Sequence, residues 1–216
     1  MRIDPAGWPF VGIGVVIAAL VAALAGSTYG IAALVLPAFF LFFFRDPERH
    51  TALGPREVVS PADGKVMVAG TPTGGFDPAV WQQVTIFLSP MDVHVNRMPL
   101  AGRVKSVKYH PGKFLPAYKR EAGDLNEHTE VVLDHGGQTI VVRQIVGILA
   151  RRIVCRVREG DEVDAGARFG VMKFGSRMDV FVPQSSTLRV KVGDRVSAGI
   201  TVIAVLPEEP DKGRQA

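Results

Sequence analysis

The N-terminal part of the chain is apolar, in contrast to the alternating pattern that follows it. No charged residue and no histidine occurs between Pro5 and Phe44. The run is interrupted around residues 26–30, where glycine, serine and threonine cluster and indicate a loop. We therefore predict two apolar helices, over residues 10–25 and 31–44, that form a hairpin.

This hairpin is expected to associate with a membrane. Each helix is near the shortest length that spans a ~30 Å hydrocarbon core, which takes about 20 residues. Arg2 precedes the hairpin, and Arg45 and Arg49 follow it, so the positive-inside tendency places both ends on the cytoplasmic face of the cell membrane. A re-entrant hairpin in one leaflet and a buried hairpin in a soluble core are the alternatives. A secretory signal is disfavoured, because the apolar character resumes after the break.

Beyond residue 50 the apolar positions follow the two-residue period of β-strands. Such runs occur over residues 65–69, 83–88, 104–110, 130–133, 139–145 and 180–182, with turn-forming residues between them. Residues 157–166 (VREGDEVDAG) also resemble residues 190–199 (VKVGDRVSAG), which suggests two related halves. The expected fold is mainly β, a barrel-sandwich-like domain of short strands with an N-terminal apolar helical hairpin.

The same pattern divides the chain into three parts. Residues 1–50 form the hairpin and its junction, residues 51–207 the β-rich domain, and residues 208–216 a polar tail. The net charge of +4 and the pI of about 9.4 suit an anionic partner. No basic run is interleaved with aromatic residues, so a lipid surface fits better than nucleic acid. The single cysteine, Cys155, excludes an internal disulfide and is expected to be a small buried residue.

Five short motifs carry the candidate chemistry. They are residues 43–49 (FFRDPER), 60–66 (SPADGKV), 88–94 (LSPMDVH), 126–127 (NE) and the Gly175-Ser176 pair within 171–183. A Gly-Ser pair between two strand-like runs is, by itself, an ordinary turn. Together and in this order, the motifs resemble those of the phosphatidylserine decarboxylases, in their short bacterial and archaeal form, over residues 42–206.

The resemblance implies that the chain cuts itself between Gly175 and Ser176. The Ser176 hydroxyl would attack the preceding carbonyl to form an ester, and β-elimination with loss of ammonia would leave a pyruvoyl group. Residues 1–175 would become the β chain and residues 176–216 the α chain. The pyruvoyl group would form a Schiff base with the amine of membrane phosphatidylserine and accept electrons as carbon dioxide leaves, giving phosphatidylethanolamine. No metal is implied, and a homodimer is left open.

The resemblance also implies roles for individual residues. Asp63, His94 and Ser176 would form the catalytic constellation, in which an aspartate can fix the tautomer of a histidine. Longer members of the family have a second histidine where this chain has Arg97. His94 is therefore expected to be the base for cleavage, the proton donor after decarboxylation, or both. The candidates for substrate binding are Asp92, Arg97, Asn126 and Glu127.

Two other classes of protein remain as alternatives. The internal repeat and residues 172–174 (MKF) resemble biotinyl and lipoyl carrier domains, in which Lys173 would be modified. A structural membrane protein with an inert Gly-Ser turn is the other. Intact mass separates the three classes: self-cleavage gives two chains, a carrier gives one chain heavier by its cofactor, and a structural protein gives one unmodified chain.

Overall fold

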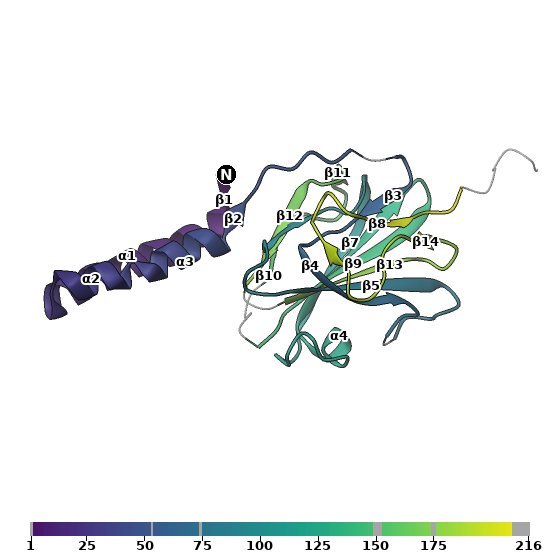
Figure 1. Ribbon diagram of the computed structural model, residues 1–216. Coiled ribbons are helices and arrows are strands. Elements are labelled where there is room, and N and C mark those ends of the chain that lie inside the picture. The colour runs from purple at the N-terminus through teal and green to yellow at the C-terminus, as the bar shows by residue number, and fades with distance from the viewer. Residues whose placement is uncertain (1, 53, 74, 149–152, 174–175, 209–216) are drawn as a thin grey trace, which may run out of the picture.

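The computed structural model describes residues 2–52, 54–73, 75–148, 153–173 and 176–208. A long helical hairpin projects from a β-rich domain (Figure 1), which confirms the expected mainly β fold with an N-terminal helical hairpin. The helices are a 3-10 turn at Pro5–Gly7, α1 (Trp8–Ala25), α2 (Ser27–Ala33), α3 (Val35–Phe43) and α4 (Ala122–Leu125). The strands are β1 (Arg2–Ile3), β2 (Arg45–Asp46), β3 (Glu57–Val59), β4 (Gly64–Gly70), β5 (Trp81–Leu88), β6 (Val95–Arg97), β7 (Gly102–His110), β8 (His128–His135), β9 (Gln138–Ile145), β10 (Ile153–Cys155), β11 (Glu162–Val163), β12 (Arg168–Met172), β13 (Ser176–Pro183), β14 (Thr187–Leu188), β15 (Arg195–Val196) and β16 (Val202–Val205).

The hairpin turns more tightly than its sequence suggests. The prediction of a loop over residues 26–30 is wrong, because helix resumes at Ser27 after a single Gly26 with φ 102°. The predicted second helix is instead two pieces that meet at Leu34. Pro37 explains this break, since it has no N–H to donate to the carbonyl of Ala33.

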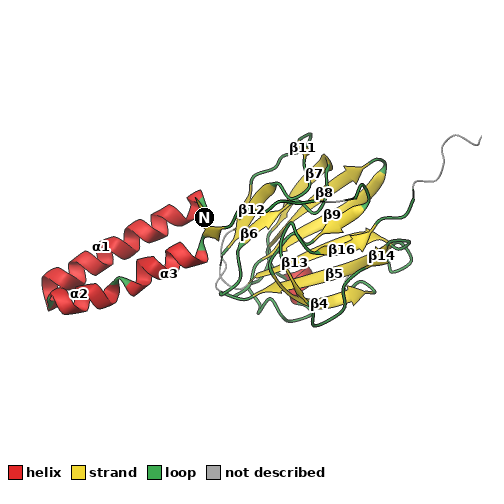
Figure 2. Cartoon of the chain, turned by 45° about the horizontal axis from the view of Figure 1, so that its top comes forward, coloured by secondary structure: helices red, strands yellow, loops and turns green. Residues whose placement is uncertain are grey.

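The two arms of the hairpin pack through small residues. A Cβ added to Gly30 would lie 2.3 Å from the Cβ of Ala22, and one added to Gly14 would lie 3.0 Å from the backbone of Pro37. Beyond this seam the hairpin is exposed and projects away from the β domain (Figure 2). This excludes the alternative of a hairpin buried in a soluble core. By length and composition, the helical stretch of residues 5–25 suffices to cross a membrane, while residues 27–43 form a shorter apolar stretch.

The β domain is built around an eight-stranded antiparallel sheet. Its order is β11-β7-β8-β9-β13-β5-β4-β15, and two three-stranded sheets, β10-β12-β6 and β14-β16-β3, accompany it. β13 lies between β5 and β9 in the large sheet. Side chains alternate between the two faces of a strand, so Met178 and Val180 enter the main apolar core together with Ile86 and Leu88 of β5.

The internal repeat is also a structural repeat. In the first copy Gly160 donates to the carbonyl of Val104, and in the second Gly193 donates to that of Val66. Both glycines have φ near +100°, at 92° and 100°, where a side chain would be strained. Each copy thus turns onto a strand of the large sheet, β7 or β4, as the two-halves prediction requires.

Candidate active site

Ser176 is the first residue of β13 and faces the interior of the domain. It pairs with Leu88 of β5 and shares the core-facing side of its strand with Met178. Its side chain is completely buried, and its Oγ has no hydrogen-bond partner in the part of the chain that the structure describes. A buried hydroxyl without a partner costs free energy, so its position calls for a functional explanation. Gly175, the other half of the predicted cleavage site, lies outside the described residues.

Two backbone connections place His94 near the predicted cleavage position. The turn that leads to it starts directly after Leu88, the register partner of Ser176. At its other end, the carbonyl of His94 accepts a hydrogen bond from the backbone of Met172, at 3.2 Å. Two strand connections therefore bring His94 to the end of the sheet at which Ser176 lies.

The two nitrogens of the His94 imidazole differ in their contacts with the described residues. Nδ1 is 2.9 Å from the carbonyl oxygen of Asp92, which only accepts hydrogen bonds, so Nδ1 carries the proton. Nε2 is buried and has no partner among the described residues. This tautomer leaves a lone pair on Nε2, as a general base requires.

The base of the hairpin covers this histidine. The ring of Phe43, at the end of α3, stacks on the imidazole with centroids 4.1 Å apart. Phe43 and Phe44 form an apolar cluster with Val93 and Val95 on either side of His94. Burial lowers the pKa of His94 to about 4, against a smaller opposite effect of the Asp92 carbonyl and charge. The imidazole is therefore neutral at pH 7.

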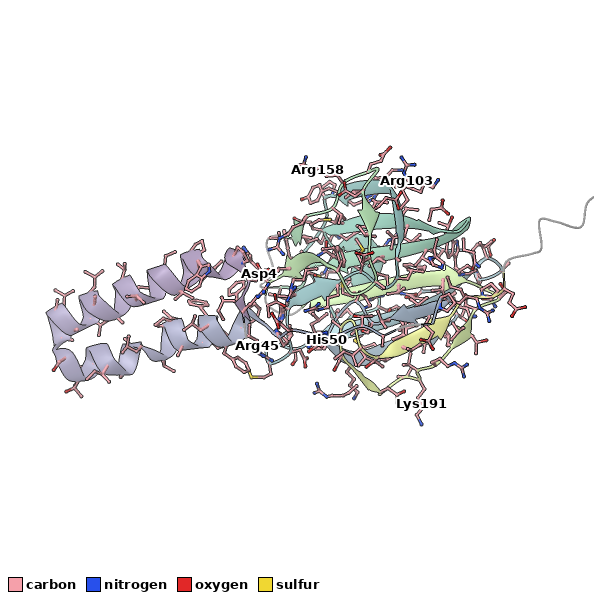
Figure 3. The ribbon with its side chains drawn as sticks, turned by 90° about the horizontal axis from the view of Figure 1, so that it is seen from above. Asp4, Arg45, His50, Arg103, Arg158 and Lys191 are labelled. Carbon is pink, nitrogen blue, oxygen red and sulfur yellow. The ribbon has the colours of Figure 1, made fainter. Side chains whose placement is uncertain are left out.

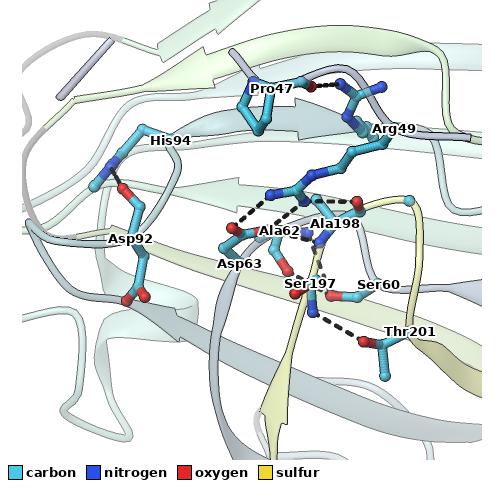
Figure 4. Close-up of polar contacts among 12 residues, drawn as sticks. Pro47, Arg49, Ser60, Ala62, Asp63, Asp92, His94, Ser197, Ala198 and Thr201 are labelled. Atoms are coloured by element: carbon cyan, nitrogen blue, oxygen red, sulfur yellow. Dashed lines mark hydrogen bonds and ion pairs between the residues drawn. The ribbon is translucent and has the colours of Figure 1, made fainter. Parts of the chain in front are cut away.

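Asp63 is paired with an arginine in this structure. Arg49 donates from Nη1 to Oδ1 at 2.5 Å and from Nη2 to Oδ2 at 2.7 Å, as Figure 4 shows. Oδ1 also accepts from the backbone of Ala198 at 2.7 Å. The expected contact between Asp63 and His94 is not among the hydrogen bonds of the described residues: the Asp63 oxygens accept from Arg49 and Ala198, and Nδ1 of His94 faces the carbonyl of Asp92. The charge of Asp63 still acts on His94, whose pKa it raises slightly.

Asp92 and Arg97 are occupied by structural contacts. Asp92 closes the turn by accepting from the backbone and hydroxyl of Ser89, at 2.8 and 2.7 Å. Arg97 is buried, and its guanidinium donates to Asp46, to the carbonyl of Pro47 and to that of Gly166. These bonds fasten the junction to the β domain and leave Arg97 poorly placed to bind a substrate phosphate.

Asn126 and Glu127 have different positions. The amide of Asn126 makes three hydrogen bonds of 2.8–2.9 Å, two to Leu115 and one to the carbonyl of Val146. It thereby fixes residues 111–125 against the sheet. The carboxylate of Glu127 lies beside the hydroxyl of the exposed Tyr109 and, after burial, contributes to raising the pKa of that group.

Sequence reasoning missed several members of this region. Arg49 and Phe43 belong to the first motif, but nothing in their spacing shows that one pairs with Asp63 and the other covers His94. A buried amide pair also escaped notice: Gln144 donates to Asn96 at 2.9 Å, while Asn96 Nδ2 and Gln144 Oε1 lack partners among the described residues. The described residues contain no group of three His, Cys, Asp or Glu side chains that could hold a metal ion.

Comparison with known proteins gives a consistent result. The family model for phosphatidylserine decarboxylase matches residues 36–204. A phosphatidylserine decarboxylase proenzyme of Solibacter usitatus is 47% identical over 187 residues, which cover 87% of this chain and 88% of the relative. The proenzymes of Geotalea uraniireducens and Burkholderia mallei are 41% and 39% identical, over 93% and 94% of this chain and 95% of each relative.

Proposed function

The chain belongs to the phosphatidylserine decarboxylase family, and we propose that it converts phosphatidylserine into phosphatidylethanolamine after cutting itself before Ser176. The observation that carries this proposal is a pair of buried atoms, Ser176 Oγ and His94 Nε2, for which the described residues supply no hydrogen-bond partner. One is a nucleophile and the other a base. They lie at the same end of the sheet, and both atoms are buried.

In the proposed cleavage, His94 Nε2 takes the proton of Ser176 Oγ as the oxygen attacks the carbonyl carbon of Gly175. The C–N bond breaks, an ester forms, and the proton passes to the nitrogen of Ser176. Removal of the Cα proton of Ser176 then breaks the Cβ–Oγ bond. This leaves a carboxylate on Gly175 and a dehydroalanine at position 176, from which one water releases ammonia and leaves the carbonyl.

The pyruvoyl group would serve as the electron sink for the loss of carbon dioxide from an amino-acid head group. The surroundings of residue 176 suit such a group, because its side chain is buried and accepts or donates no hydrogen bond within the described residues. His94, with a buried Nε2 at the same end of the sheet, is then the candidate for returning a proton to the substrate carbon. Asp92 holds the ring of His94 through its carbonyl, and Asp63 acts on it through its charge. A single histidine would thus carry both proton transfers.

The hairpin would hold the site at the membrane surface, on its cytoplasmic face. Asp4 and Arg45 mark the base of the hairpin, where it joins the β domain (Figure 3). Arg45 lies over the ring of Phe42, 3.9 Å from its centroid, and donates to the carbonyl of Met91 in the turn before His94. At the base of a hairpin inserted in the membrane, this charge would lie at the height of the lipid head groups. We assign residues 1–50 to membrane attachment and residues 51–207 to catalysis.

Activity on vesicles tests this proposal. The parent protein should release carbon dioxide from phosphatidylserine, and Ser176→Ala should remain folded, uncut and inactive. Lys173→Arg is the matched control, since it removes the attachment point of a carrier domain but keeps a cation over the ring of Phe10. Full activity of Ser176→Ala would refute the proposal, and an intact parent chain carrying a covalent group that Lys173→Arg lacks would favour the carrier alternative.

A further inference from the structure

The face of the large sheet opposite Ser176 carries a buried charged network. Arg177 follows Ser176 directly and, because side chains alternate along a strand, points to the other face. Its side chain is 1% exposed. Its guanidinium donates twice to the carboxylate of Asp179, from Nε to Oδ1 at 2.7 Å and from Nη2 to Oδ2 at 2.8 Å. A two-point ion pair therefore begins one residue after the cleavage position.

The neighbouring strands hold Asp179 in turn. Thr85 of β5, its register partner, donates to Asp179 Oδ1 at 2.8 Å, and Gln83 donates to the hydroxyl of Thr85 at 2.9 Å. On the other side, Asp179 lies opposite Arg143 of β9. Asp179 is thus held by Arg177 and by Thr85 of the adjacent strand β5, and a buried network of this kind has little freedom to rearrange.

Residues 111–125 also pack against the side chain of Arg177. Its Nη1 donates to the carbonyl of Lys119 at 3.3 Å. Gly123 lies so close that an added Cβ would be 3.0 Å from Arg177 Nη2. The same segment is fixed from its other end by Asn126. One side chain therefore joins the start of β13 to the segment that covers it.

Cleavage makes this arrangement important, because it turns residue 176 from an internal residue into a chain end. Chain ends fray unless local contacts hold them. The pairing of β13 with β9 starts at Arg177, so residue 176 has a strand neighbour on one side only. We propose that the Arg177–Asp179 pair positions residue 176, first as the nucleophile and then as the pyruvoyl carbonyl. This inference rests on the proposed function and makes Arg177 and Asp179 positioning residues that do not touch the substrate.

The geometry of the pair sets the expectation for variants. A reacting group displaced by about 1 Å can lose a hundredfold in rate. Lysine offers one point of contact where the planar guanidinium offers two, so Arg177→Lys should hold residue 176 less firmly. Replacing both partners with apolar side chains of similar volume, as Arg177→Met with Asp179→Leu, removes the pair without leaving a buried charge.

The test compares full-length proteins made by cell-free synthesis in the presence of lipid vesicles. Glu130→Gln is the matched control, because Glu130 pairs with Arg143 on the same face at 2.8–2.9 Å but lies on β8, away from β13. Self-cleavage is followed with time, and kcat and KM for phosphatidylserine are measured on the cleaved fraction. Thermal melting reports on the fold.

The parent and the control should cleave at similar rates. The double variant should melt cooperatively within a few degrees of the parent, yet cleave at least about tenfold more slowly. Its cleaved fraction should lose kcat by a similar factor with KM nearly unchanged, and Arg177→Lys should be intermediate. A purely structural pair would instead lower the melting temperature without separating kcat from KM.

Parental cleavage and kcat in the double variant would overturn the inference. If the double variant does not melt cooperatively, the test rests on Arg177→Lys. Cleavage and kcat at the parental values in Arg177→Lys would then overturn the inference. An uncut, inactive parent would refute the proposed function and the inference together. A cut, active parent with unaffected variants would refute the inference alone.

Discussion

The clearest quantitative prediction is the rate of self-cleavage in acid, which depends on the fraction of His94 that is neutral. If His94 is the base for self-cleavage, the rate should follow the fraction of neutral imidazole. Burial lowers its pKa to about 4. At pH 5 about 90% of such a histidine is neutral, against about 3% for one with the ordinary pKa of 6.5. The rate at pH 5 should therefore be about thirtyfold higher than an exposed histidine would allow.

The lowered pKa of His94 also predicts that the folded protein is less stable in acid. Because the pKa of His94 is lower in the folded than in the unfolded state, the unfolded state binds the proton more tightly, and stability falls as pH drops from about 6.5 toward 4. The loss from this one group is about 2 kcal/mol at pH 5 and about 3 kcal/mol once pH is below 4. Cleavage must therefore be measured while tryptophan fluorescence shows that the protein remains folded.

The assay is the initial rate of cleavage between pH 4 and pH 8, started by a pH jump of freshly made proenzyme. The rate should stay level down to about pH 5 and fall below it. Phe43→Ala should move the midpoint upward toward 6.5, because it removes the ring that stacks on His94. A midpoint near 6.5 in the parent, or no shift in Phe43→Ala, would refute the reasoning.

Three further predictions follow from the contacts around the site. Asp63→Asn leaves the largely buried guanidinium of Arg49 without its charge partner and should lower the free energy of unfolding by about 3 kcal/mol; an unchanged urea midpoint would contradict this. Asn126→Ala removes three hydrogen bonds and should cost about 3 kcal/mol, with faster amide exchange in residues 111–125, so parental exchange would count against its anchoring role. Gly30→Leu should force the arms of the hairpin apart and reduce vesicle binding, whereas Gly12→Leu, with nothing within 4 Å of an added Cβ, should not; equal binding by the two variants would show that the seam is unimportant.

Local sequence signals were sufficient for most of the fold. The alternating runs and turn glycines gave the main strands, and the repeat gave two equivalent turns, because strand period and turn chemistry are local properties. The hairpin was predicted, but not its details. Ser27 and Thr28 are typical loop residues, yet one glycine sufficed for the turn. Pro37 removes the helical hydrogen bond to the carbonyl four residues earlier, and the pattern of apolar residues does not show this loss.

The site was harder to predict, because its contacts join residues far apart in the sequence. The motifs indicated Ser176 and His94, which the structure brings to one end of the sheet. They did not show that Arg49 would take the carboxylate of Asp63, or that Arg97 would be committed to the junction with Asp46. Both pairings depend on where the hairpin enters the domain, and that geometry is tertiary.

The most direct test of the central claim is the intact mass of the purified protein under denaturing conditions. The account predicts two chains, one ending at Gly175 and one beginning at residue 176 with a pyruvoyl group in place of serine. A single chain of full mass from a preparation that decarboxylates phosphatidylserine would contradict the account, since the carbonyl would then have to come from elsewhere.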